Sequence, residues 1–163
     1  MRRSTIVLLL LIAALSRVAV SQWGGAPLVS LTAGVGHPFG GIGLQGEVLI
    51  ADGRLGIIGG AGTLPGFHYL RSPITGAASF RYYFARQQHR LFANASWSLL
   101  QAYDLLMLGV PTVYEYGPGI CLGYSFVSKA GLTFTVGAGV GRTSHETVPI
   151  GELGLGWTWR RSS

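Results

Sequence analysis

The segment LTFTVGAGV (residues 132–140) decides how the chain is interpreted, because its large apolar residues alternate strictly with threonine and glycine. A period of two places neighbouring side chains on opposite faces of a strand, whereas an amphipathic helix repeats every 3.6 residues. The segment therefore predicts a strand with one apolar face and one small, polar face.

Other parts of the chain alternate in the same way, and no segment after residue 21 keeps a helical period over three turns. The further strand candidates are residues 29–36, 42–50, 55–63, 77–84, 91–99, 119–127 and 152–159, of which 55–63 is rich in glycine and less regular. Together with 132–140, these segments predict eight strands.

The connections between the strands add detail to this prediction. Asp52-Gly53 is a two-residue hairpin signal, whereas the segments 64–73 and 101–111 are long. Pro118 cannot donate a hydrogen bond to a neighbouring strand, so we expect a bulge at 117–119. The segment 99–108 is too apolar for a solvated loop, which leaves open a short helix, an interfacial segment, a cap over the barrel or additional strand length.

The composition indicates where the apolar faces point. The chain has 163 residues, of which 48% are hydrophobic, 26 are glycine, 12 are Lys or Arg and 6 are Asp or Glu. So few charges cannot cover the surface of a soluble domain, but lipid can cover an apolar outer face. We therefore expect an all-β fold: a closed antiparallel eight-stranded transmembrane β-barrel with a polar interior.

The N-terminus predicts export from the cytoplasm. Arg2 and Arg3 precede the apolar run 6–15, and the small-residue site Ala19-Val20-Ser21 follows it. This arrangement is typical of a secretory signal peptide and is too short to span a membrane as a helix. We expect a signal peptide at 1–21 and one barrel domain at 22–163.

The last strand carries a resemblance to a known class of proteins. In ELGLGWTW (152–159), a polar residue, a glycine and two aromatic residues stand at Glu152, Gly154, Trp157 and Trp159. This pattern resembles the C-terminal assembly signal of outer-membrane β-barrels, although four more residues follow it here. The chain thus resembles small eight-stranded outer-membrane β-barrel proteins. The resemblance implies the outer membrane of a Gram-negative-type bacterium, with the lipid bilayer and the outer-membrane assembly machinery as partners.

Four charged residues fall on the polar faces of the predicted strands: Glu47, Arg81, Glu115 and Glu152. Charges inside a narrow barrel must pair or remain hydrated. We therefore expect a polar network in the lumen in which Arg81 pairs with Glu47 or Glu152. A proton relay or a site for an ion or solute is the alternative interpretation of these four residues.

Other chemistry has weaker support. Ser144, His145 and Glu152 resemble the Ser-His-Glu set of barrel lipid A deacylases, but the His-x-Ser signature of those enzymes is missing because residue 147 is Thr. The four histidines lie in four different connections, so we expect no metal site. The GxGxxG match at 41–46 continues into a strand rather than a helix, so we expect no cofactor. The single cysteine, Cys121, excludes an intramolecular disulfide.

The expected function is therefore that of a non-enzymatic outer-membrane barrel. Its role would be envelope structure, surface interaction or limited passage of a small solute, because a glycine-rich inner face leaves room for a cavity. The basic residues form no stripe, so nucleic acid is not expected as a partner. The alternatives are a lipid A-modifying hydrolase and a secreted soluble β-barrel that binds an apolar ligand.

Overall fold

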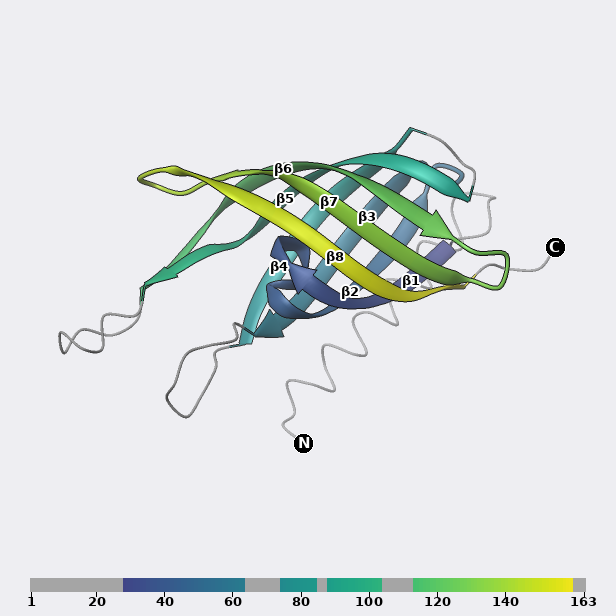
Figure 1. Cartoon of the computed structure of the whole chain (residues 1–163), viewed down its shortest axis with the longest axis horizontal. Coiled ribbons are helices and arrows are strands. Elements are labelled where there is room, and N and C mark those ends of the chain that lie inside the picture. The colour runs from purple at the N-terminus through teal and green to yellow at the C-terminus, as the bar shows by residue number, and fades with distance from the viewer. Residues whose placement is uncertain (1–27, 64–73, 85–87, 104–112, 160–163) are drawn as a thin grey trace.

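The computed structural model describes residues 28–63, 74–84, 88–103 and 113–159, which form one closed antiparallel barrel of eight strands (Figure 1). The strands are β1 (Leu28–Gly36), β2 (Gly41–Ile50), β3 (Leu55–Thr63), β4 (Ile74–Tyr83), β5 (His89–Tyr103), β6 (Val113–Val127), β7 (Leu132–Arg142) and β8 (Thr147–Trp159). Each strand pairs with the next, and β8 pairs with β1. The predicted all-β closed barrel and its eight strands are confirmed. The predicted leader, residues 1–21, lies outside the described residues.

The two faces of the barrel wall differ sharply in chemistry. Large apolar side chains on every strand point outward, and Leu122, for example, is 67% exposed. Polar and charged side chains point inward and are almost completely buried, among them Thr32, Gln45, Arg81 and Asn94. Within the described residues, no helix is long and apolar enough to cross a membrane.

The barrel wall is uneven in height. We call the end at which β1, β3, β5 and β7 finish the loop end, and the opposite end the turn end. β5 and β6 have 15 residues each, whereas β1 has 9. The pairing of β1 with β8 stops at Gly36 and Glu152, so β8 continues beyond β1 toward the loop end. Since β5 extends to Tyr103, the first part of the apolar segment 99–108 is additional strand length; residues 104–108 lie outside the described part.

Two local predictions are wrong. The connection between β2 and β3 is not a two-residue hairpin, because Ile50 pairs with Leu55 and residues 51–54 form the turn. Ala51 and Asp52 both have positive φ, and the amide of Gly53 donates to the carbonyl of Ile50 at 3.0 Å. The glycine therefore occupies the third position of a longer turn.

The second wrong prediction concerns Pro118. It pairs with Trp97 without any shift in register, and it lies one residue beyond the β6–β7 pairing, which begins at Gly119. The bulge lies instead on β5, between Leu99 and Gln101. The extra residue, Leu100, places its side chain against Gly117 and Gly141 on the inner face.

The connection between β1 and β2 folds into the barrel and fills part of its interior. Its residues His37–Phe39 form the 3-10 helix η1, seen as a dark blue coil within the barrel in Figure 1. All three are buried, and η1 contacts β3, β4, β5 and β8 as well as its neighbours. A Cβ atom at Gly60 would lie 1.9 Å from the carbonyl oxygen of Pro38, so only glycine leaves room for η1 there. The glycine-rich inner face, which leaves room for a cavity, thus receives a part of the chain itself.

Candidate functional site: charged residues of the barrel interior

Arg81, on the inner face of β4, is the centre of a buried ionic cluster. Its Nη2 atom donates to both carboxylate oxygens of Glu152 on β8, at 2.8 and 2.9 Å. Its Nη1 atom lies 3.9 Å from Oε2 of Glu47 on β2. The side chains of Arg81 and Glu152 are both 0% exposed. The sequence prediction that Arg81 pairs with one of these carboxylates agrees with this geometry.

Glu47 obtains most of its hydrogen bonds from neighbours that the sequence analysis did not select. The Tyr83 hydroxyl donates to Oε1 and Oε2 of Glu47 at 2.9 and 3.0 Å, and Ser30 Oγ donates to Oε2 at 3.3 Å. Tyr83 follows Arg81 by two residues on β4, so it shares the inner face. That period of two was the signal that could have identified it.

Two aromatic rings cover the cations of the interior. The Cζ atom of Arg81 lies 4.1 Å from the centroid of the Phe92 ring, and that of Arg90 lies 4.0 Å from the Tyr83 ring. An arginine over an aromatic face is attracted by the ring quadrupole, and more strongly where water is excluded. Phe92 and Arg90 also lie on the inward phase of β5, and Arg90 lies just before the predicted strand 91–99.

Glycines on the neighbouring strands β3 and β6 make space for these large side chains. A Cβ atom at Gly56 would lie 2.1 Å from Oε1 of Glu47, and one at Gly123 would lie 2.2 Å from Cζ of Phe92. The interior is therefore divided between long side chains on β2, β4, β5 and β8 and glycines that face them. The result is an anchored cluster in which Arg81 pairs with Glu152, and Glu47 accepts hydrogen bonds from Tyr83 and Ser30.

Glu115, the fourth predicted member of the lumen network, lies elsewhere. It is near the loop end of β6, where its Oε1 atom accepts a hydrogen bond from Ser144 Oγ at 3.1 Å and lies 3.5 Å from His145 Nε2. The side chain of His145 is 78% exposed. Glu115 thus belongs to the rim of the barrel and not to the Arg81 cluster.

The weakly supported catalytic set is not assembled in one place. Glu152 is bound to Arg81 inside the barrel, whereas Ser144 and His145 lie in the exposed β7–β8 connection. Both Ser144 and His145 are directed to the same oxygen of Glu115. A catalytic nucleophile needs its base within hydrogen-bond reach, and the base needs an orienting group. Here the nucleophile candidate Ser144 and the base candidate His145 both approach the Glu115 carboxylate.

The four residues of the predicted assembly signal divide between the faces. Glu152 points inward to Arg81, and Gly154 faces Phe39 and Thr32, where a Cβ atom would lie 2.7 Å from each. Trp157 and Trp159 point outward and are 41% and 52% exposed. Half of the motif therefore has a packing role within this barrel.

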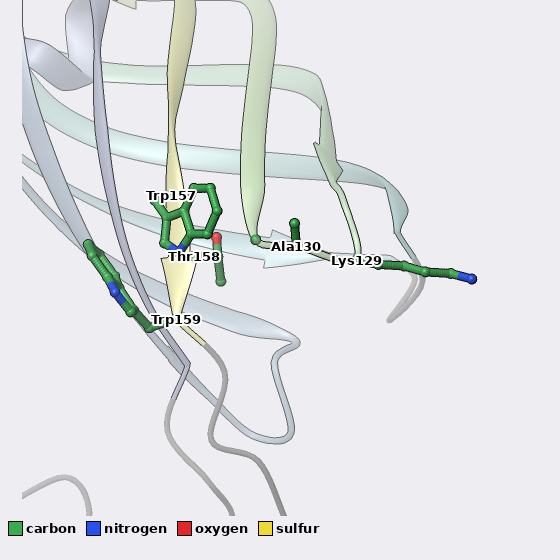
Figure 2. A pocket seen from close by; sticks show the side chains of 6 residues that line it. Lys129, Ala130, Trp157, Thr158 and Trp159 are labelled. Carbon is green, nitrogen blue, oxygen red and sulfur yellow. The ribbon is translucent and has the colours of Figure 1, made fainter.

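The turn end has a shallow pocket beside the end of β8, lined by Lys129, Ala130, Gly131, Trp157, Thr158 and Trp159. Figure 2 shows the Lys129 side chain extending away from Trp157 and Trp159. Among the described residues, no group of three His, Cys, Asp or Glu side chains is placed to hold a metal ion.

Comparison of the chain with models of protein families, with curated proteins and with solved structures gives no match. The functional argument therefore rests on the geometry of the barrel itself.

Proposed function

We propose that this protein is a membrane-spanning β-barrel of the bacterial outer membrane with a non-enzymatic role in the envelope. The observation that carries the proposal is the direction of the two faces. Leucine, valine, phenylalanine and tryptophan side chains cover the outside, while Arg81, Glu47 and Glu152 are buried. A soluble protein rarely exposes apolar patches larger than a few hundred Å², whereas a bilayer requires an apolar outer band.

The backbone arrangement supports the same proposal. All eight strands are paired on both sides around a closed ring, so the barrel has no unpaired edge along its middle. Hydrocarbon offers no partner for a free amide or carbonyl, and closure removes that cost. Strands of 9–15 residues are long enough to cross the hydrocarbon at a tilt.

The inner cluster supports a structural rather than a catalytic role. Arg81 Nη2 is bound to Glu152, and Glu47 is held by Tyr83. Groups bound in this way brace opposite walls of the barrel. The alternative lipid A hydrolase would need Glu152 near Ser144 and His145, and no contact of the described residues favours that alternative.

Targeting and assembly complete the proposal. Residues 1–21 direct export and are removed, and the outward-facing Trp157 and Trp159 are presented to the assembly machinery as the end of β8. In this orientation, the loop end faces the cell exterior and the turn end faces the periplasm.

Expression of the full chain in a Gram-negative host tests the proposal. We expect the protein in the outer-membrane fraction, with a mass lacking residues 1–21. The unboiled protein should migrate differently from the boiled protein, because a closed barrel resists the detergent of the gel. Recovery of folded protein from the soluble periplasm without detergent would instead favour a soluble barrel with an apolar ligand.

A further inference from the structure

The connection between β1 and β2 closes the loop end of the lumen through packing more than through polar bonds. Phe39 is 0% exposed and its ring occupies the space above Gly34 and Gly154. The polar contacts between the connection and the strands include a 3.4 Å approach of His37 Nδ1 to the Gly151 carbonyl and a hydrogen bond from Thr75 to the Gly40 carbonyl. Within the connection, the Gly40 amide donates to the His37 carbonyl at 3.2 Å. We refer to residues 37–39 as the plug.

The wall formed by β4 and β5 is polar and has hydrogen-bonding capacity to spare. Ser79, Asn94 and Ser98 are 3%, 2% and 0% exposed, yet Ser79 Oγ, Ser98 Oγ and both amide atoms of Asn94 have no partner in the described structure. Gln45 on β2 also has an unpaired buried oxygen. Buried polar groups of this kind are normally satisfied by protein, water or a ligand.

The formal charges of the buried inner face balance, because two arginines, Arg81 and Arg90, and two glutamates, Glu47 and Glu152, are buried there. His37, in the connection between the strands, adds no charge: burial lowers its pKa to about 4, so the imidazole is neutral at pH 7. A wall of hydroxyl and amide groups with balanced charges suits small uncharged molecules that carry hydroxyl groups.

We propose that the plug closes a vestibule for small uncharged polar molecules, whose binding surface is the Ser79, Asn94 and Ser98 wall. Displacement of the plug opens this wall to solution from the loop end, down to the level of the Arg81–Glu152 ion pair. The inference goes beyond a structural role in the envelope and depends on the barrel, not on its membrane.

The chain carries its own reporter for this proposal. Cys121 is the single cysteine of the sequence, lies on the inner face of β6 and is 3% exposed. It is the direct cross-strand neighbour of Asn94. In the closed barrel the thiol packs against Leu49, Tyr83 and Phe92. On this proposal, a small water-soluble reagent that enters from the loop end and reaches Asn94 comes beside the Cys121 thiol, so displacement of the plug speeds modification of Cys121.

The experiment measures the rate at which 2-hydroxyethyl methanethiosulfonate, a small uncharged thiol reagent, modifies Cys121. The folded barrel is used in detergent, with folding checked by the shift between boiled and unboiled samples. Gly60→Ala displaces the plug, because its methyl group would overlap the Pro38 carbonyl. Gly59→Ala is the matched control, since a Cβ atom there has nothing within 4 Å.

Phe39→Ala provides a second way to open the plug without introducing a clash, and it keeps the test readable should Gly60→Ala fail to fold. Phe80→Ala, on the outer face of β4, is its matched control. We expect each plug variant to increase the modification rate at least about tenfold over the wild type, with both controls within twofold. Rates for folded plug variants equal to those of the wild type would overturn the proposal, even if the protein proved to reside in the outer membrane.

Discussion

At the scale of single residues, the interior depends on one arginine that is held from several directions. Arg81 is bound by Glu152 on the far side of the barrel, lies near Glu47 and is covered by the ring of Phe92. Burying a charge is costly unless it is paired and hydrogen-bonded. Arg81 can therefore be buried in this barrel only together with Glu152, Glu47 and Phe92.

Replacement of Arg81 tests that dependence. We expect Arg81→Ala to lower the free energy of unfolding by about 3–5 kcal/mol, because it leaves Glu152 buried without its cation. The double variant Arg81→Ala, Glu152→Ala should recover part of the loss. Urea titrations of the barrel folded in lipid vesicles measure both values.

Arg54→Ala is the control for this experiment, since Arg54 is exposed in the turn between β2 and β3. It should change stability by no more than about 0.5 kcal/mol. Equal losses for Arg54→Ala and Arg81→Ala would argue against a structural ion pair. So would a double variant whose loss equals the sum of the losses measured for Arg81→Ala and Glu152→Ala separately.

At the scale of elements, the alternation of residue types explains the wall of the barrel. Gly34, Gly43 and Gly62 lie beside one another on β1, β2 and β3 near the loop end, so the backbones approach closely there. A Cβ atom at Gly43 would lie 2.2 Å from the carbonyl oxygen of Ala61 on the neighbouring strand. Gly46, also on β2, has nothing within 4 Å of its Cβ position.

This difference gives a prediction within one strand. Gly43→Ala should destabilise the barrel by about 1–3 kcal/mol, because the methyl group forces the backbones apart. Gly46→Ala should be tolerated, since its methyl group points outward. Unfolding free energies in the same vesicles provide the comparison, and a larger loss for Gly46→Ala would mean that the faces of β2 are assigned the wrong way round.

The elements also show what sequence could and could not predict. The phase of each strand follows from a local period of two, so the inward placement of Arg81, Glu47 and Glu152 was accessible before the structure. The plug was not, because nothing in His37-Pro38-Phe39 indicates that a short connection turns inward. Its position depends on space left by Gly60 and Gly154 on distant strands. Glu115 was predicted to belong to the lumen network but lies at the rim. Its position depends on the length of β6 and on the bulge at Leu100, which arise from strand pairing and not from the local sequence.

At the scale of the whole molecule, the barrel has polar and charged side chains inside and apolar side chains outside, which is the reverse of a typical soluble protein. The chain of 163 residues contains 18 charged residues, and the charged side chains of the Arg81 cluster are hidden. The exterior is apolar around the entire ring of strands. Monomeric soluble proteins rarely expose apolar surface on this scale, which is typical of surfaces that contact a membrane or another molecule.

The measurement that tests this account most directly is the effect of a charge placed at two depths on the outer face. Leu122, on β6, pairs with Ala93 of β5 and with Ala138, which is near the middle of β7. Ile74 is the first residue of β4 and lies at the loop end. Both are strongly exposed, at 67% and 87%. In phospholipid vesicles, Leu122→Arg should lower the unfolding free energy by about 2–4 kcal/mol and Ile74→Arg by about 0–1 kcal/mol. Equal and negligible effects at both positions would contradict a membrane-spanning barrel, since arginine is tolerated anywhere on a surface that water covers.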